Sequence, residues 1–364
     1  MRVAIVGSGL AGFTAYQTLR RELAPEEIAV FGADDDPAAA FRRGAAAIRQ
    51  RQMRSESDGH CLPTSFPGLA LSSTVRRRSV RPLLGTLCDC FHPTVDEFLA
   101  HVERLRDRSG WERSFRRARI ERIRAVDGGF ELDGHGRFRH VLVAPGHPGL
   151  NVPDELRSDP RAVHSYEEHD YAPTVTVVGA GLAAATEWLN ALAAGSEVVS
   201  VRRREPVRRP LNVPREYFSR RGLDGFHRLG PGERSARLRA LLAPSYPPGR
   251  AWDEPLATAM MEDRYRVDPS VNGSAQVICA TGFVHGYAHD ALLAGLAAAH
   301  DLDTVDGWIV VDPDGSVPAL TDETRTLALA GVAAQWAFPA ADTLAGARYL
   351  AHGFLGRIRS CRTP

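Results

Sequence analysis

Short apolar runs that end at glycine recur along this chain, and segments with helical periodicity follow them. Residues 2–6 (RVAIV) are apolar and rich in β-branched side chains, which predicts a buried strand that enters a glycine turn. Residues 9–23 carry the helical pattern, and residues 28–31 (IAVF) predict a second strand. A fresh strand, turn and helix begin at residue 173. This alternation predicts an α/β fold with parallel sheets.

Further elements follow from local signals. Thr94 and Glu97 have the spacing of a capping box, which predicts an amphipathic helix over residues 94–108. Residues 40–93 are rich in Arg, Ser, Pro and Gly, which predicts irregular structure with a few short helices. The other predicted strands lie within residues 118–126, 129–134, 139–146, 197–201, 275–283 and 327–332, and the other predicted helices lie within 232–243 and 342–358.

The composition is that of an ordinary globular protein, and 364 residues are enough for two domains. The net charge of +1 gives no global field toward nucleic acid or an anionic membrane, so the arginine runs at 76–78 and 202–204 are local features. No apolar run approaches the roughly 18 residues that span a bilayer, and no secretory signal is recognisable. We therefore predict a cytoplasmic protein with neither a nucleic-acid nor a membrane partner.

Lysine is absent, and all 45 basic residues are arginine. This absence excludes Schiff-base chemistry, a lysine base and a Walker-A loop, because each needs the ammonium group. The five cysteines are predicted to be reduced thiols, and Cys88 and Cys90 are too close in sequence for a usual redox dithiol or zinc knuckle. His285 and His289 stand four residues apart without a third ligand nearby, so we predict no metal site.

The same glycine turn occurs twice, within residues 3–19 (VAIVGSGLAGFTAYQTL) and residues 175–192 (VTVVGAGLAAATEWLNAL). In such a turn the first glycine permits a tight reversal, the second lets the backbone approach a pyrophosphate, and the third position packs helix against strand. The helix N-terminus then offers free N–H groups to the phosphates. Both copies follow a predicted strand and open a predicted helix, which is the required context. The predicted cofactor-binding positions are Gly7, Gly9 and Gly12 in the first copy and Gly179, Gly181 and Ala184 in the second.

The two copies differ where the second strand ends. In the second copy Arg202 and Arg203 fall at this position, and guanidinium groups suit a 2′-phosphate, which predicts NADP rather than NAD. In the first copy the position holds Gly32, where an acidic residue usually binds the ribose. Asp34 is the nearest carboxylate and would reach a ribose if the loop folded back. A flavin in the first site and a nicotinamide in the second would give a direct hydride path between the two rings.

These residues resemble the flavoproteins with two dinucleotide-binding domains. Residues 141–153, with Gly146, resemble the segment that leaves the first domain, and residues 278–283, with Thr281 and Gly282, resemble the ATG segment that returns to it. The resemblance implies an FAD-binding Rossmann-like domain with an inserted NADP-binding Rossmann-like domain. The expected limits are 1–171 and 275–364 for the FAD-binding domain and 172–274 for the inserted NADPH-binding domain.

Within that group the chain is similar to the flavin-containing monooxygenases and the N-hydroxylating monooxygenases of ornithine and lysine. Residues 211–229 resemble their Asn-Glu-x-Phe segment, which implies a catalytic role for Asn212 near the nicotinamide. Residues 341–351 resemble a helix start over the flavin, which implies that Asp342 and Leu344 contact this cofactor. Residues 52–60 resemble a loop beside the isoalloxazine ring, which implies the same for Met53.

The resemblance implies an NADPH- and FAD-dependent monooxygenase that uses O2 and a C4a-hydroperoxyflavin to oxygenate a nitrogen or sulfur nucleophile. Ser245 stands where these enzymes have a second substrate-binding asparagine and no lysine is present, which argues against ornithine or lysine as the substrate. Two alternatives remain: a flavoprotein reductase that passes electrons to another acceptor, and an NADP-binding protein that has lost the flavin. A thioredoxin-reductase dithiol is excluded, because residues 173–275 contain no cysteine. Related proteins are often dimers or tetramers, which makes a homo-oligomer an open expectation.

Overall fold

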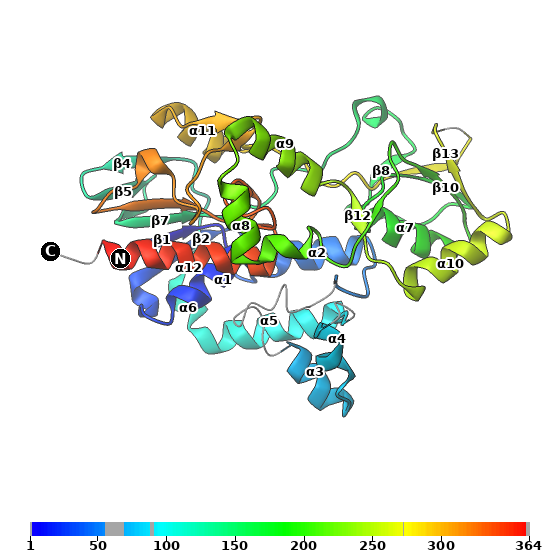
Figure 1. Cartoon of the computed structure of the whole chain (residues 1–364), viewed down its shortest axis with the longest axis horizontal. Helices are drawn as coiled ribbons and strands as arrows, with labels where there is room; N and C mark the ends of the chain where they lie inside the picture. Colours follow the sequence, from blue (N-terminus) through cyan, green and yellow to red (C-terminus); the bar gives the residue numbers. More distant parts are fainter. Residues whose placement is uncertain (1, 55–68, 88–90, 272, 362–364) are drawn as a thin grey trace.

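Two parallel five-stranded sheets organise the chain in a computed structural model that describes residues 2–54, 69–87, 91–271 and 273–361 (Figure 1). The first sheet has the order β17-β7-β1-β2-β3, which are Thr326–Leu329, His140–Val143, Val3–Val6, Ile28–Gly32 and Phe115–Arg117. The second has the order β13-β10-β9-β14-β8, which are Tyr265–Asp268, Glu197–Val201, Thr174–Val178, Gln276–Cys279 and Ala162–His164. Both sheets are covered by helices, as continuous apolar strands require.

The first sheet is covered by helices on one face and by a three-stranded meander on the other (Figure 1). Helices α1 (Leu10–Leu19) and α12 (Leu344–Ser360) pack closely against each other beneath β1 and β7. The meander and α11 (Ala291–His300) lie on the opposite side. The meander strands are β4 (Ile123–Val126), β5 (Gly129–Leu132) and β6 (Gly136–Phe138). The sheet is therefore the buried middle layer of the first domain, and β1 is buried along its whole length.

The helices that follow β2 lie to one side of this domain. They are α2 (Ala39–Ala47), α3 (Leu69–Arg77), α4 (Arg81–Leu87), α5 (Val95–Ser109) and α6 (Trp111–Ser114). The predicted capping box opens α5, because the Glu97 amide donates to Thr94 Oγ1 at 3.1 Å and the Thr94 amide donates to Glu97 Oε2 at 2.9 Å. Helix α2 runs toward the second domain, whereas α3 and α4 project away from the body of the molecule (Figure 1).

The second sheet is packed by α7 (Leu182–Ala193) and α10 (Arg250–Met261). Its strands β8 and β14 come from the segments flanking residues 172–274, so this sheet extends beyond the predicted insertion at both ends. The predicted limits were 1–171, 172–274 and 275–364. The second sheet therefore includes one strand from each of the two segments that were assigned to the FAD-binding domain. The small remaining strands are β11 (Val207–Arg208) with β12 (Ser245–Tyr246) and β15 (Thr304–Val305) with β16 (Trp308–Ile309).

Residues 211–241 of the predicted insertion pack on the first domain. They hold α8 (Arg220–His227) and α9 (Pro231–Leu241), and their apolar side chains belong to the core of the first sheet. His227 Nε2 lies 2.6 Å from the carbonyl oxygen of Ala337, and the Arg234 guanidinium lies 5.0 Å from the centre of the Trp336 ring. The chain thus packs on the first domain over residues 211–241 and adds β13 and β14 to the second sheet only afterwards.

Most of the predicted strands and helices are confirmed, and the exceptions have local reasons. Strands β3 and β8 are only three residues long, so the residue alternation that identifies a strand is too short to recognise. Helix α11 consists almost entirely of small and apolar residues and lacks a polar face. Short 3₁₀ helices cover Pro25–Glu27, Asp154–Leu156, Arg215–Phe218, Tyr287–His289, Pro318–Leu320 and Gly331–Ala334. No helix in the described ranges is long and apolar enough to cross a membrane.

Candidate functional site

The first glycine turn joins β1 to α1 in the predicted form. Gly7 has φ of 115°, and a Cβ there would lie 1.9 Å from the carbonyl oxygen of Ala144. A Cβ on Gly12 would lie 1.9 Å from the oxygen of Gly7, so neither position tolerates a side chain. Gly9 is the N-cap of α1 and has open space around its Cα. The turn therefore leaves the first N–H groups of α1 accessible to a phosphate group.

The second glycine turn joins β9 to α7 and repeats this arrangement. Gly179 has φ of 143°, and a Cβ there would lie 2.3 Å from the carbonyl oxygen of Ala280. Gly181 is the N-cap of α7, and a Cβ there would meet only Pro244, at 3.9 Å. Ala184 is fully buried, so a small residue takes the third position between helix and sheet. Both domains thus present a helix N-terminus with the shape of a pyrophosphate site.

The end of β2 explains why glycine occupies position 32. A Cβ on Gly32 would lie 2.0 Å from Ser8 Oγ and 2.8 Å from the Ser8 amide nitrogen. Ser8 Oγ donates a hydrogen bond of 2.7 Å to the carbonyl oxygen of Asp34. The loop after β2 therefore folds back onto the glycine turn, and an acidic side chain at position 32 has no room there.

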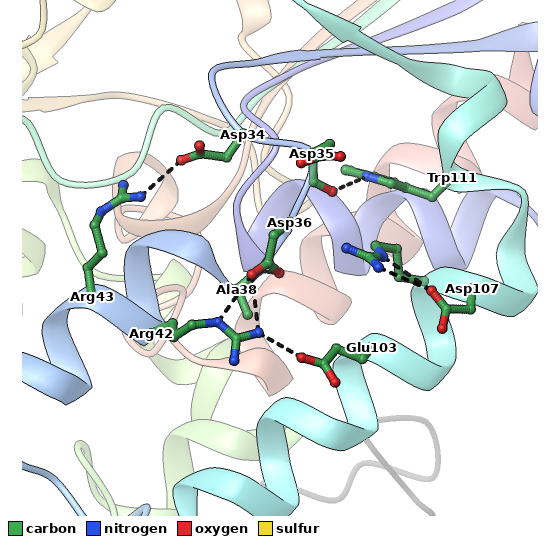
Figure 2. Close-up of polar contacts among 10 residues, drawn as sticks. Asp34, Asp35, Asp36, Ala38, Arg42, Arg43, Glu103, Asp107 and Trp111 are labelled. Atoms are coloured by element: carbon green, nitrogen blue, oxygen red, sulfur yellow. Dashed lines mark hydrogen bonds and ion pairs between the residues drawn. The ribbon is translucent and has the colours of Figure 1, made fainter.

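The Asp34 carboxylate turns toward α2. Figure 2 shows it accepting a hydrogen bond of 3.2 Å from Arg43 Nη1. Beside it, Arg42 joins Asp36 at 3.2 Å and Glu103 at 2.9 Å, which ties α2 to α5. A ribose bound by Asp34 would have to compete with Arg43. Asp34 as a ribose ligand therefore stays a prediction.

The arginines at the end of β10 differ in their surroundings. The Arg202 side chain is only 14% exposed and pairs with Glu205 at 3.0 Å, whereas Arg203 is 90% exposed and lies 3.6 Å from Glu155. Arg202 Nε is buried and has no hydrogen-bond partner. A buried donor of this kind is costly unless a ligand satisfies it. Of the two predicted residues, Arg202 is therefore the more enclosed, and a phosphate contact by either of them stays a prediction.

The two segments that connect the domains are hydrogen-bonded to each other. The Asn151 amide donates to the Gly282 oxygen at 2.9 Å, and Thr281 Oγ1 donates to the Asn151 oxygen. His164 Nε2 lies 3.0 Å from the Gly282 oxygen. Gly146 has φ of 81° with open space around its Cα. In this structure Thr281 and Gly282 therefore build the hinge, and cofactor contacts by them and by Gly146 stay predictions.

A cavity of about 870 Å³ lies along this hinge. Its lining includes Asn151, Arg157, His164, Phe283 and His285 but none of the predicted site residues. Rings stack beside it: Phe283 lies 4.0 Å from His147 and 5.0 Å from Tyr166 between ring centroids. These rings pack beside the segments that connect the two domains.

Two residues predicted independently meet at the start of α12. Asn212 Nδ2 donates a hydrogen bond of 3.1 Å to Asp342 Oδ1, and the Asn212 side-chain oxygen accepts from the Val213 amide at 3.1 Å. The Asp342 side chain reaches solvent, but many protein atoms surround it, and the resulting loss of hydration raises the pKa of its carboxyl to about 6. The pair therefore forms a polar contact between the inserted segment and the first domain.

Arg54 lies beside this pair, and sequence reasoning did not single it out. Its Nη2 donates to the carbonyl oxygen of Ser245 at 2.8 Å and lies 3.3 Å from Ser245 Oγ, whereas its Nε is buried without a partner. Burial, with Arg209 nearby, lowers the pKa of Arg54 to about 10, and the Asp342 carboxylate opposes this shift. Arg54 remains a cation at neutral pH. In the sequence, the available indication was a basic residue directly after the predicted Met53. Only the structure shows that this residue lies near Ser245 and Asp342.

The remaining predicted positions border the same region. Met53 is partly buried against the first core, and its amide donates to the Pro93 oxygen at 2.8 Å. Leu344 is the first residue of α12 and packs against the same core. Residues 55–60 of the predicted ring-side loop lie outside the described residues. Within the described ranges, no group of three His, Cys, Asp or Glu side chains has the geometry of a metal site.

Comparison with solved structures identifies the architecture. The ornithine N-hydroxylase of Kutzneria sp. 744 superposes with a TM-score of 0.75 at 16% identity, over 99% of this chain and 99% of the other. The cadaverine monooxygenase of Erwinia amylovora gives 0.74 at 13% identity, over 98% and 94%. This chain has their fold. The two-domain Rossmann-like architecture expected from the sequence is therefore confirmed.

The same fold also occurs in enzymes that have a different activity. The bacillithiol disulfide reductase of Staphylococcus aureus gives a TM-score of 0.59 at 12% identity, over 98% of each chain. Comparisons with protein-family models and with curated proteins give no match. The activity must therefore be argued from the residues of the site.

Proposed function

We propose that this chain is an NADPH- and FAD-dependent monooxygenase that oxygenates a nitrogen or sulfur nucleophile. The observation that carries the proposal is the pairing of two pyrophosphate-shaped glycine turns with a polar cluster between the domains, formed by Asn212, Asp342 and Arg54. The solved structures of the same fold include one with reduced FAD, NADP+ and ornithine and another with FAD. Their activities support this assignment by analogy of fold.

The residues of the first turn fit FAD. Gly7, Gly9 and Gly12 leave the start of α1 open for the pyrophosphate, and Ser8 holds the loop after β2 against the turn through its hydrogen bond to the carbonyl oxygen of Asp34. Reduced flavin supplies the electrons that activate O2, so the protein needs little acid–base machinery of its own. The chain's contribution is to orient the ring and to keep water away from it.

The second turn fits NADPH. Gly179 and Gly181 open the start of α7 to the pyrophosphate, and the partly enclosed Arg202 would offer its guanidinium group to a 2′-phosphate. The hinge of Asn151 and Gly282 sets the orientation of this domain toward the first. Orientation of this kind is the main protein contribution to hydride transfer.

The cluster at the start of α12 would act on the substrate. Asn212 and Asp342 hold each other in place, and the carboxyl of Asp342 changes its protonation near pH 6, so it is available to accept a proton from a bound nucleophile. Arg54 adds a positive charge with an unsatisfied donor. The chain has no lysine to help bind an amino acid, so its substrate is expected to differ from ornithine and lysine.

A reductase without oxygenation is the second candidate. The disulfide reductases of the same fold favour it, and every cofactor feature above is shared by both functions. A dithiol of the thioredoxin-reductase type is not available to it, because residues 173–275 contain no cysteine. An NADP-binding protein without flavin is the third, and Gly32 is the feature that favours it.

The deciding experiment combines an absorbance spectrum with oxygen uptake. The purified protein is expected to show a flavin spectrum that bleaches with NADPH, and its oxygen consumption should yield a hydroxylated amine or oxidised sulfur product with a matching substrate. If NADPH oxidation with an added quinone or disulfide as electron acceptor continues unchanged without O2, the result would favour the reductase. A colourless protein that releases no flavin on denaturation would leave only the NADP-binding protein.

A further inference from the structure

Exposed apolar side chains concentrate on the helical hairpin α3–α4. Among the described residues, ten large apolar side chains are strongly exposed, and six of them lie between positions 71 and 87, with exposed fractions from 40% to 71%. The six are Leu71, Val75, Val80, Leu83, Leu84 and Leu87. Apolar groups gathered in this way mark an interaction surface, whereas single exposed ones need no explanation.

The same hairpin is strongly basic. Residues 69–87 contain Arg76, Arg77, Arg78 and Arg81 and no aspartate or glutamate. Arg76 and Arg77 pair with the buried carboxylate of Glu97 on α5, and both keep a large part of their side chains exposed. Arg78 and Arg81 are exposed as well. The hairpin therefore carries a net positive charge although the whole chain is almost neutral.

The pairing with Glu97 also holds the hairpin in position. Ser73 Oγ donates to Glu97 Oε1 at 3.1 Å, and Glu97 belongs to the capping box of α5. Leu69, Ala70 and Pro82 face inward and are buried. The exposed apolar side chains thus belong to a hairpin that packs against α5 on one side and keeps these side chains accessible to solvent on the other. Figure 1 shows this hairpin projecting from the body of the molecule.

Although the net charge of the whole chain predicts no membrane partner, we propose that the α3–α4 hairpin docks the protein on the surface of an anionic phospholipid bilayer. Leu71, Val75, Val80, Leu83, Leu84 and Leu87 would enter the headgroup region, and the arginines would contact lipid phosphates. Charge decides between this occupant and the others. A second copy docked through the same face would bring two arginine clusters together, which costs energy. The hairpin projects outward and lines neither cavity described in the structure, which disfavours a peptide bound in a groove.

The test is co-sedimentation of the full-length protein with vesicles. Vesicles of phosphatidylcholine mixed with phosphatidylglycerol are compared with vesicles of phosphatidylcholine alone, at low and high salt. We expect at least about tenfold tighter binding to the anionic vesicles and loss of this preference at high salt. Leu84→Asp combined with Leu87→Asp should abolish binding, and Arg78→Gln combined with Arg81→Gln should weaken binding to anionic vesicles alone.

A matched control comes from the second domain. Met261 on α10 is 80% exposed, and Met261→Asp should leave vesicle binding unchanged. Circular dichroism and thermal melting show whether each variant is folded. Equal binding to both kinds of vesicle, no binding to either, or binding that survives the Leu84→Asp and Leu87→Asp changes would overturn the proposal. A dimer in lipid-free solution that the same double variant converts to monomer would also overturn it, since a second copy would then be the occupant. None of these results depends on flavin or NADPH chemistry.

Discussion

Asn212 and Asp342 are joined by a hydrogen bond of 3.1 Å between the asparagine Nδ2 and the aspartate Oδ1. They come from the inserted segment and from the start of the last helix. The contact depends on how residues 211–241 return to pack on the first domain. It places an amide and a titratable carboxyl near the partly buried Arg54.

Replacing Asp342 should change how activity depends on pH. Burial raises the pKa of this carboxyl to about 6, so it is mostly ionised above pH 6 and mostly protonated below it. Asp342→Asn removes this ionisation, and a step near pH 6 in the pH profile of substrate-dependent NADPH oxidation should disappear. Thr343→Ala is the control, because Thr343 caps the same helix through Gly346 at 3.1 Å. It should cost about 1 kcal/mol of stability and leave the profile unchanged. A profile unaltered in Asp342→Asn would show that this carboxyl is not in the reaction.

Gly32 should resist substitution because of Ser8. A Cβ at position 32 meets Ser8 Oγ at 2.0 Å, so Gly32→Ala should lower the free energy of unfolding by about 1–3 kcal/mol. Adding Ser8→Gly should recover part of this loss, because the Ser8 amide nitrogen still lies 2.8 Å from the new atom. Denaturant unfolding measures both variants. Equal destabilisation with and without Ser8→Gly would contradict this account of the glycine.

Coenzyme preference should depend on Arg202 more than on Arg203. Arg202 is partly enclosed and has an unpaired Nε, whereas Arg203 extends into solvent. Arg202→Gln should lower the ratio of kcat/KM for NADPH to that for NADH by at least about tenfold, because a charged hydrogen bond to the 2′-phosphate is lost. Arg203→Gln is the matched control and should leave the ratio nearly unchanged. The reverse order of the two effects would move the phosphate site to Arg203.

The protein should lose stability in acid through His140. This side chain is fully buried at the start of β7, and burial, with Arg2 and Arg139 nearby, lowers its pKa to about 4. The unfolded state binds the proton near pH 6.5, so stability falls as the pH drops from 6.5 toward 4. His140→Leu should remove about 2 kcal/mol of the loss between pH 8 and pH 5. Thermal melting at both pH values measures it, and an identical loss in the variant would show that other histidines carry the effect.

The local elements of the fold could be predicted from the amino-acid sequence. Both glycine turns, the strands around them and the capping box of Thr94 and Glu97 depend on residues within a few positions of one another, and all of them appear in the structure. Apolar strands that end in glycine and precede an amphipathic helix have few alternatives, which is why the α/β class was predictable. The short strands β3 and β8 were not, because pairing with neighbours defines them.

The basic hairpin was visible only in part. The run at 76–78 could be read as a local positive feature, but the exposure of the six apolar side chains beside it could not. Leucine and valine in a helix predict burial in the absence of other information. Only the folded chain shows which of these side chains are exposed to solvent.

The sequence by itself determined the order of strands and helices, the two glycine turns and the difference between an arginine and a glycine at the ends of the strands that follow them. Tertiary structure decided the surroundings of those residues. Ser8 excludes a side chain at position 32, Arg202 rather than Arg203 is enclosed, and Arg54 lies near the Asp342 carboxylate, which accepts a hydrogen bond from Asn212. The reason is one of range. Turn and helix preferences are set by neighbours along the chain, whereas burial, pKa and side-chain partners are set by segments that meet only after the chain has packed.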